Sequence, residues 1–281
     1  MYNQSMFASI KDALAKSEKS GGNPLYKEIL KFKAGNTYVL RLLPNVNDPS
    51  KTFFHYFQHG WNSFATGEYV SALSLQTIGK PDPIGIETYR IKKNGTQEQK
   101  EKAQSVKWQE QWYVNVYVVD DPVTPANNGT VKIFRFGKKL NNIIESAISG
   151  DDSDEFGAKV FDLSKDGVNF KLKAEKQGEY TTYDSSRFTS PVSLNLSDEK
   201  IEEIYGSVHD LTAVNPLKSE EELIEMWNKH FVVKETFETK PQSKTPVSSQ
   251  QEDEVDEEVD HSSTKELSDE MVNELLKGYD Q

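Results

Sequence analysis

The stretch that decides the fold is WYVNVYVVDDPVTPANNGTVKIFRFGKK, residues 112–139. Its first half is apolar at every second position, which is the period of a β-strand lying over a core: Trp112, Val114, Val116 and Val118. Tyr113, Asn115 and Tyr117 face the other way. The two prolines and the Asn-Asn-Gly of residues 120–129 predict a turn, and residues 131–136 predict a return strand. The stretch therefore predicts a β-hairpin.

The hairpin ends in a cluster of rings and cations. Phe134, Arg135 and Phe136 are followed at once by Lys138 and Lys139. Aromatic rings beside cations on a sheet can stack bases and neutralise phosphates. The same pattern fits a core hairpin with solvated lysines, so the hairpin alone leaves both interpretations open.

Charge is distributed very unevenly along the chain. The formal net charge is −12, but residues 241–281 hold 12 acidic residues against three lysines, which leaves −3 for residues 1–240. Residues 89–139 hold ten Lys or Arg against five Asp or Glu. A polyanionic ligand is therefore compatible with the hairpin region, although it conflicts with the charge of the whole chain.

The chain of 281 residues contains no cysteine. This excludes a disulfide framework, cysteine-ligated metal and thiol catalysis. The N-terminus lacks the pattern of a signal peptide, and no stretch approaches the length of a membrane span. We therefore expect a soluble, cytoplasmic protein.

Short strands predominate around the hairpin, which favours a small barrel or sandwich, mainly β with α additions. We expect strands at residues 37–43, 53–61, 69–75, 160–163 and 169–174, and a turn at 79–85. Residues 97–107 fit either a helix or a mobile loop, and residues 140–148 fit a short helix. Ser197 and Ser219 each open a helix with an acidic first turn, and together these predict a helical flap over residues 197–233.

Both ends of the chain differ from the core of residues 21–240. Residues 1–20 predict a short amphipathic arm that contacts another subunit or packs on its own domain. Residues 241–281 predict a disordered acidic tail. Its last part has apolar residues at helical spacing, which indicates a partner motif, a decoy for the basic region or a merely solubilising tail: Leu267, Met271, Leu275 and Leu276.

We find no pattern typical of an enzyme. Phosphate-binding glycine loops, nucleophile elbows and kinase-type metal carboxylates are missing from the sequence. The acidic run at residues 151–155 lacks the spacing of a calcium loop and fits a solvated turn. His55 and His59 lie four apart in an expected strand, where that spacing does not serve a metal, so we expect structural histidines.

The chain resembles the single-stranded DNA-binding, helix-destabilising proteins of T-even-type bacteriophages over nearly its full length. The matching pieces are VVDDPVTPANNG leading into FRFGKKL, NFKLK followed by YTTYDSSRF, and HGW followed by GEYV. The resemblance implies an oligonucleotide-binding (OB) fold core, an arm for cooperative filaments and a tail that recruits replication and recombination proteins. It also implies protection of single strands during DNA replication, recombination and repair in the cytoplasm of the infected bacterial host.

The basic region and the resemblance together nominate the DNA contacts. They are Tyr89, Arg90, Lys92, Lys93, Lys107, Trp108, Trp112, Tyr113, Phe134, Arg135, Lys138, Lys139, Tyr180, Tyr183, Arg187 and Phe188. Only Lys107 is kept of a basic run that the family places there. The family's short basic motif in the first ten residues is also missing, so Lys11, Lys16 and Lys19 are the candidates for self-association.

The resemblance implies a zinc site that this sequence departs from. The family typically binds a structural zinc through one histidine and three cysteines, and His59 is the one retained ligand position. Asp82 and Gly85 stand where the family has a Cys-x-x-Cys pair, and the third cysteine falls within residues 72–74. Because one histidine cannot hold tetrahedral zinc, we expect no metal and a subdomain near residues 53–90 held by Ile78, Ile84, Ile86 and nearby rings.

The sequence is compatible with two other functions. A protein-interaction scaffold would use the tail and helices and leave the basic region as ordinary surface. An RNA chaperone would use the same stacking and phosphate contacts.

Overall fold

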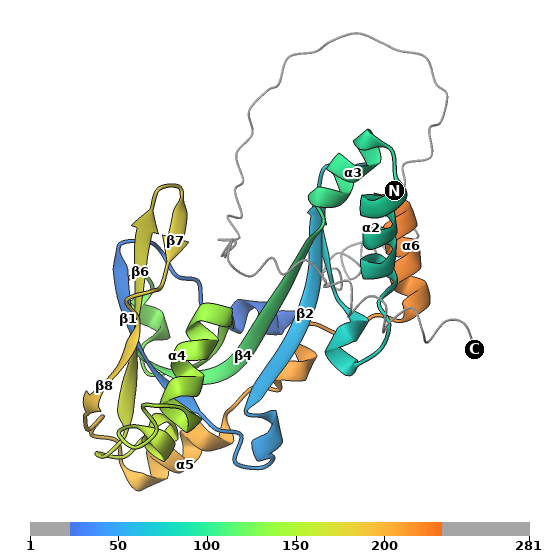
Figure 1. Cartoon of the computed structure of the whole chain (residues 1–281). Coiled ribbons are helices and arrows are strands. Elements are labelled where there is room, and N and C mark those ends of the chain that lie inside the picture. Colours follow the sequence, from blue (N-terminus) through green and yellow to red (C-terminus); the bar gives the residue numbers. More distant parts are fainter. Residues whose placement is uncertain (1–22, 232–281) are drawn as a thin grey trace, which may run out of the picture.

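The computed structural model describes residues 23–231. Within this range eight strands form one curled, mainly antiparallel sheet, and five α-helices lie around it (Figure 1). The strands are β1 (Asn36–Leu43), β2 (Phe53–Asn62), β3 (Tyr69–Leu73), β4 (Lys107–Asp120), β5 (Val131–Gly137), β6 (Val168–Gln177), β7 (Tyr180–Thr182) and β8 (Arg187–Pro191). The helices are α2 (Pro83–Asn94), α3 (Gln97–Gln104), α4 (Lys138–Ser149), α5 (Asp198–Gly206) and α6 (Glu220–His230).

The sheet has the strand order β3-β2-β4-β1-β6-β7, with β5 paired to β4 and β8 paired to β6. It curls into a half-barrel, which together with the helical additions is consistent with an OB-like fold. The expected mainly β class is therefore confirmed.

The predicted hairpin is β4 and β5, and the turn between them contains a short 3₁₀ segment, Pro125–Asn127. Asp121 organises this turn, because its carboxylate accepts from the backbone N–H groups of Val123 and Thr124 and from the side chain of Asn127. Gly129 adopts a φ of 79°, which a residue with a side chain rarely takes.

Both faces of β4 are covered. On one face Val114, Val116 and Val118 pack with Leu140 and Ile144 of α4. We call this hydrophobic cluster of the half-barrel the main core. On the other face Asn115 exchanges hydrogen bonds with the backbone of His209, so residues 209–214 cover that side. The alternation read from the sequence is confirmed, but neither face of this part of β4 is open to solvent.

A second hydrophobic cluster holds the subdomain formed by the C-terminal end of β2, the N-terminal end of β4, β3, α2, α3 and α6. We call the cluster the subdomain core, and its buried members are Trp61, Ala72, Leu75, Ile84, Ala103, Val106, Leu223, Trp227 and Phe231. Ile84 packs here as expected. Ile78 does not, because it is exposed at the end of the 3₁₀ helix η3 (Leu75–Ile78).

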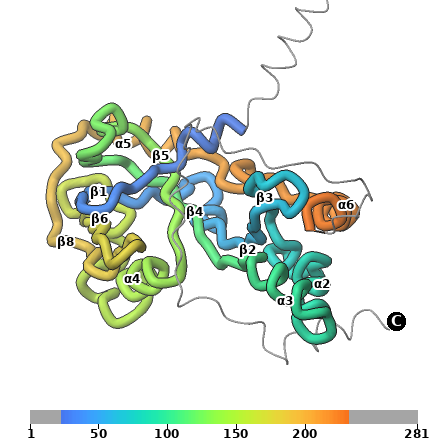
Figure 2. The backbone as a smooth tube through the Cα atoms, turned by 90° about the horizontal axis from the view of Figure 1, so that it is seen from above, coloured from blue at the N-terminus to red at the C-terminus, as the bar shows by residue number. Residues whose placement is uncertain are grey.

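The two helices expected to form one flap pack on separate parts of the molecule. Ile204 of α5 packs with Leu43 and Leu163 beside the half-barrel, whereas Leu223 and Trp227 of α6 pack in the subdomain core. Figure 2 shows this separation, with α5 and α6 at opposite ends.

Two local predictions are wrong. The expected turn at residues 79–85 contains the start of α2, since Asp82 caps this helix and Pro83 occupies its first position. Residues 160–163 are not a strand: Val160 lies in a 3₁₀ helix, Gly157–Phe161, and its side chain packs into the main core. For residues 97–107, the choice between a helix and a loop is settled: residues 97–104 form α3, two residues turn, and Lys107 begins β4.

A fully buried arginine ties β1 to the far edge of the sheet. Arg41 donates through Nε and Nη2 to Oδ1 of Asn169, and through its Nη atoms to the carbonyl oxygens of Asp162, Ser164 and Val192. Burial lowers the pKa of this guanidinium, and nearby Asp162 partly offsets that effect.

No helix within residues 23–231 is long and apolar enough to cross a membrane.

Candidate nucleic-acid interface

A series of stacked rings runs along β2 and β4. His55 lies opposite Trp112 in the strand register, and their rings stack with centroids 4.5 Å apart and planes 13° apart. Phe57 stacks on Trp108 at 4.9 Å and 14°. Residues directly or diagonally opposite on an antiparallel pair bring their side chains together on one face, which is why these rings meet.

The ring series has a buried end and a partly exposed end. Trp112 stacks on Phe136 at 6.2 Å and is itself buried. His55 is the outermost of these rings, with 43% of its side chain exposed and Nε2 2.9 Å from Oε1 of Glu110. Phe57 and Trp108 are partly exposed. The open ring faces of this surface therefore belong to His55, Phe57 and Trp108, with Trp112 beneath His55.

His55 and Phe57 are missing from the residues nominated by the sequence. Their alternation within FFHYFQHGW could have placed them on one face of a strand. Only the register of β2 against β4, however, shows that this face also carries Trp108 and Trp112.

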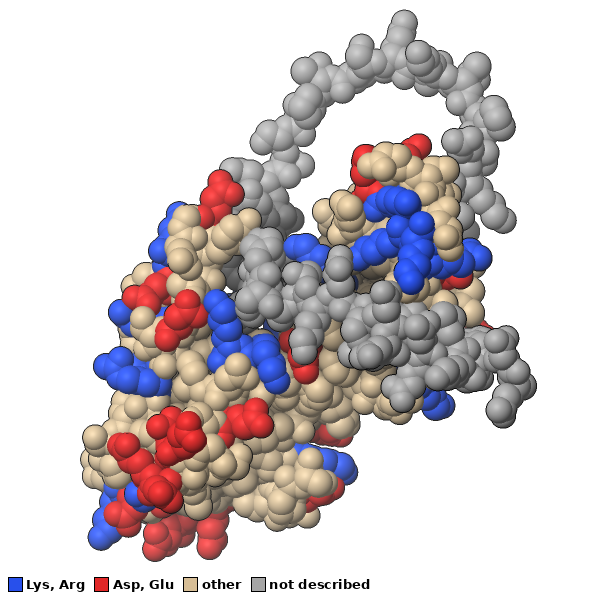
Figure 3. Space-filling view, in the orientation of Figure 1, with Lys and Arg blue, Asp and Glu red and all other residues tan. Residues whose placement is uncertain are grey.

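Cations lie beside aromatic rings at two places, one of them in the ring series. Lys138, the first residue of α4, has Nζ 5.3 Å from the centroid of the Trp112 ring. On α2, Lys93 Nζ lies 4.4 Å from the centroid of the Tyr89 ring. Figure 3 shows Lys and Arg side chains over α2 and beside α4, whereas Asp and Glu side chains gather around α5 at the opposite end. On the visible face these cations thus lie apart from the acidic side chains around α5.

The nominated residues of α2 lie on or near its surface. Arg90, Lys92 and Lys93 are exposed, and Tyr89 is partly buried. Arg90 pairs with Glu87 at 2.8 Å, one helical turn away. Lys107 is partly buried at the start of β4, beside Trp108.

The segment after β6 comes close to the end of the hairpin. Lys139 Nζ lies 3.4 Å from Oδ1 of Asp184, which links α4 to the YTTYDSSRF segment. In that segment Tyr180 is 49% exposed on β7, and Arg187 is exposed at the start of β8. Tyr183 is partly buried against Phe32, with ring centroids 6.3 Å apart. Both views place β6, to which β7 is paired, and α2 on opposite sides of β4 (Figures 1 and 2).

Besides Trp112, three nominated rings are buried, and none of these three belongs to the ring series. Phe134 is 0% exposed, Tyr113 1% and Phe188 6%. Phe134 and Phe188 lie in the main core because α4 and neighbouring segments cover that side of the sheet, and Tyr113 packs on the opposite face with Tyr56 at 4.7 Å. These three rings therefore support the sheet and are not part of the contact surface that we propose.

Arg135 lies on the opposite face of the sheet from the ring series. It is paired with Tyr113 in the register, whereas Trp112 is paired with Phe136. Burial raises the pKa of the Tyr113 phenol, and the nearby Arg135 partly offsets that rise. The structure thus separates Arg135 from Lys138, although only two residues lie between them in the sequence.

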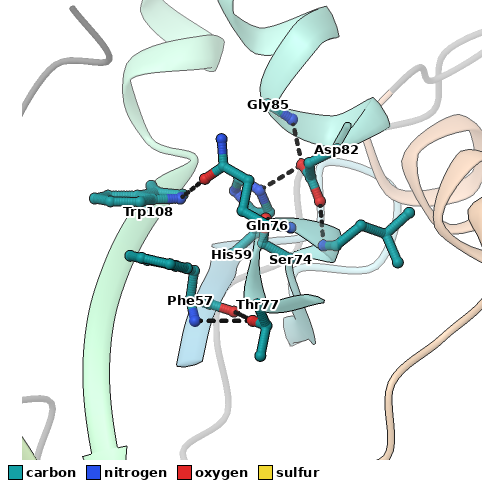
Figure 4. A network of polar contacts seen from close by, with 9 residues as sticks. Phe57, His59, Ser74, Gln76, Thr77, Asp82, Gly85 and Trp108 are labelled. Atoms are coloured by element: carbon teal, nitrogen blue, oxygen red, sulfur yellow. Dashed lines mark hydrogen bonds and ion pairs between the residues drawn. The ribbon is translucent and has the colours of Figure 1, made fainter. Parts of the chain in front are cut away.

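The 3₁₀ helix η3 holds the outer ring pair in place (Figure 4). Trp108 donates from Nε1 to Oε1 of Gln76 at 3.1 Å. The backbone N–H of Phe57 donates to Oγ1 of Thr77 at 3.0 Å, and that hydroxyl donates back to the carbonyl oxygen of Phe57 at 3.3 Å. These bonds fix both strands relative to η3, so the two rings stay stacked.

A curled, OB-like sheet that carries stacked rings on one face, with a lysine beside them, defines a class: β-sheet proteins that bind nucleic acid. Within that class the chain belongs to the family described as gp32 DNA binding protein like, whose model matches residues 33–234. This is a family of DNA-binding proteins and not of enzymes.

Two relatives are named as single-stranded DNA-binding proteins. The one from Enterobacteria phage T4 is 33% identical over 199 residues, and the one from Enterobacteria phage T2 is 31% identical over 198 residues. Each alignment covers 68% of this chain and 64% of the relative, so the matched part spans a little under two thirds of the relatives' length. The resemblance drawn from the sequence is confirmed for the core of the chain, residues 33–234.

Proposed function

We propose that this protein binds single-stranded DNA without sequence preference. The observation that carries the proposal is the stacked series His55–Trp112 and Phe57–Trp108 on one face of β2 and β4, with Lys138 beside it. Every base has a flat face, so stacking on such rings tolerates any sequence. The names of the phage T4 and T2 relatives support the same ligand.

Single strands are favoured over duplex because the rings can only take bases that are not stacked within a helix. A protein that binds the single-stranded form alone shifts the melting equilibrium by mass action. We therefore expect the protein to lower the melting temperature of duplex DNA.

Phosphate contacts add an affinity that depends on salt. The exposed or bordering cations that we assign to them are Arg90, Lys92, Lys93, Lys107, Lys138, Lys139 and Arg187. Each neutralised phosphate of a single strand lowers log K by about 0.7 per tenfold increase in salt. The side chains of Tyr89, Tyr180 and Tyr183 are the further stacking candidates.

Titration with oligo(dT), followed by tryptophan fluorescence, tests the proposal. The chain has four tryptophans. Trp61 and Trp227 are buried in the subdomain core, whereas Trp108 and Trp112 belong to the ring series. Stacking should therefore quench the wild-type protein, and the double variant Trp108→Phe/Trp112→Phe should bind with little quenching.

The outcome also separates the alternatives. If neither fluorescence nor the anisotropy of labelled oligo(dT) changes, the proposal is wrong and a protein-interaction scaffold becomes the better interpretation. If matched RNA binds more tightly than DNA, the protein acts as an RNA chaperone.

The two ends of the chain lie outside the described residues, and their roles stay proposals. We assign residues 1–20, with Lys11, Lys16 and Lys19, to self-association on DNA. We assign residues 241–281 to contacts with replication and recombination proteins, through Leu267, Met271, Leu275 and Leu276, and to competition for the basic surface. Deleting residues 241–281 should raise duplex destabilisation, and an unchanged melting temperature would count against that competition.

Because the named relatives come from bacteriophages, we place this activity in DNA replication, recombination and repair inside an infected bacterial cell.

A further inference from the structure

A buried histidine and a buried aspartate form the centre of the subdomain (Figure 4). His59 Nε2 lies 2.7 Å from Oδ2 of Asp82, and their side chains are 3% and 1% exposed. The same carboxylate accepts from the backbone N–H of Leu75 at 3.0 Å and from that of Gly85 at 2.6 Å. One side chain thus joins β2, η3 and the first turn of α2.

The residues present do not fit the zinc site that the family resemblance implies. A closed structural zinc site takes four side-chain ligands. Here His59 and Asp82 are two, Gly85 has no side chain, and residues 23–231 contain no group of three or more His, Cys, Asp or Glu side chains placed to hold a metal. His59 Nδ1 is buried and has no hydrogen-bond partner within these residues.

We propose that the His59–Asp82 pair takes the structural place of the metal and closes the subdomain without one. The Asp82 carboxylate is hydrogen-bonded to three chain segments and holds them together, which a structural metal would do by coordination. Although burial raises the pKa of the Asp82 carboxyl, the neighbouring His59 and the backbone N–H groups of Gly85 and Leu75 lower it below its usual value.

The geometry of the neighbouring positions supports this replacement. A Cβ built on Gly85 would lie 3.2 Å from Oδ2 of Asp82 and 3.9 Å from Cε1 of His59, so a side chain there would enter the same site. Ser74 is fully buried, and the backbone N–H of the next residue, Leu75, donates to Asp82. Four positions from β2, the β3–η3 junction and the start of α2 therefore converge on one point.

The His59–Asp82 pair also positions the outer ring pair, Phe57 and Trp108. Asp82 holds Leu75, the first residue of η3, and η3 supplies Gln76 to Trp108 and Thr77 to Phe57. A loosened pair should let η3 shift, and the Phe57–Trp108 stack should loosen with it.

The first test is metal content. The full chain, purified with zinc in every buffer and then dialysed, should retain no stoichiometric zinc by mass spectrometry, and its melting temperature should not respond to EDTA. About one tightly held zinc per chain, whose removal lowers the melting temperature, would overturn the proposal.

The second test separates the pair from simple helix capping. Asp82→Ser keeps a cap for α2 but cannot reach both His59 and Leu75. Losing one partner of a buried pair should lower the melting temperature by about 6 to 20 °C. The matched control is Ser219→Ala, which removes the cap of α6 in the same subdomain and should cost about 2 to 4 °C. Equal losses in the two variants would contradict the role given to the pair.

The third test rebuilds a metal site. The variant Ser74→Cys/Asp82→Cys/Gly85→Cys places three thiols around His59, and it should bind about one Co²⁺ with the absorption of a tetrahedral thiolate site. Wild-type protein should bind none. A folded triple variant that binds no Co²⁺ would show that the four positions do not share one point. None of the three tests depends on DNA binding.

Discussion

The imidazole of His55 lies flat on the indole of Trp112, with the planes 13° apart. Trp112 is only 8% exposed, so the histidine covers it. A base that approaches this part of the surface therefore meets His55 first and extends the existing stack of His55, Trp112 and Phe136. His55 should accordingly contribute to binding through its ring.

Removing this ring should weaken binding. Stacking contributes about 1 to 3 kcal/mol per base, so His55→Ala should lower the affinity for oligo(dT) by about 5- to 150-fold. His55→Phe keeps the flat ring and should stay close to wild type. Tyr26→Ala serves as a control, because Tyr26 is an exposed ring near Arg135 on the opposite face. If Tyr26→Ala weakens binding and His55→Ala does not, DNA binds the opposite face and our assignment is wrong.

The position of Lys138 predicts a change in salt dependence. Lys138→Ala should reduce the slope of log K against log salt by about 0.7, the value expected for one phosphate of a single strand. Arg135→Ala should change the slope less, because Arg135 lies on the other face. Lys200→Ala on α5 is the surface control. If Arg135→Ala has the larger effect, the assignment of the two faces must be reversed.

The buried guanidinium of Arg41 predicts a large loss of stability without a direct effect on the ring series. Arg41→Met leaves Asn169 and three carbonyl oxygens without their donor, and should lower the free energy of unfolding by at least about 3 kcal/mol. Urea unfolding measures this loss. Lys171→Met, an exposed change on β6, should stay within about 0.5 kcal/mol of wild type.

Alkaline pH should lower the stability of the protein through Tyr56, which lies on the face opposite the ring series. Burial raises the pKa of Tyr56 well above its ordinary value of 10.0, and its hydroxyl donates to Oε1 of Gln111 at 2.8 Å. Above pH 10 the unfolded chain loses this proton before the folded chain does, so the stability that Tyr56 contributes falls as pH rises.

Denaturant midpoints measured from pH 8 to 11 should decrease, and the decrease should be smaller for Tyr56→Phe. An identical pH profile for both proteins would contradict this role.

Much of the half-barrel could be predicted from local patterns. The alternation in β4, the turn residues before Gly129 and the amphipathic spacing of α4 are properties of contiguous sequence. The start of α2 was also readable, since Asp82-Pro83 is a capping signal followed by the proline of a first helical turn. Gly79 and Gly85 on either side favour a turn instead, and the prediction of a turn at residues 79–85 rests on them.

The arrangement of the candidate site could not be predicted in the same way. Whether Phe134 is open or buried depends on α4 covering its face, and whether Arg135 joins Trp112 or Tyr113 depends on the register of β5 against β4. Both are set by contacts between distant segments, so a motif that joins an aromatic and an arginine does not show which of them faces a ligand.

The length of β4 limits how the molecule can move. This strand runs without interruption from Lys107 at the subdomain to Asp120 in the half-barrel, and eight successive residues of β2 pair with it. The two parts are thus joined by a stiff ribbon rather than by a hinge. We expect any closure around a bound strand to come from α2 and α3 or from the β6–β7 hairpin, while the ring series itself serves as a rigid platform.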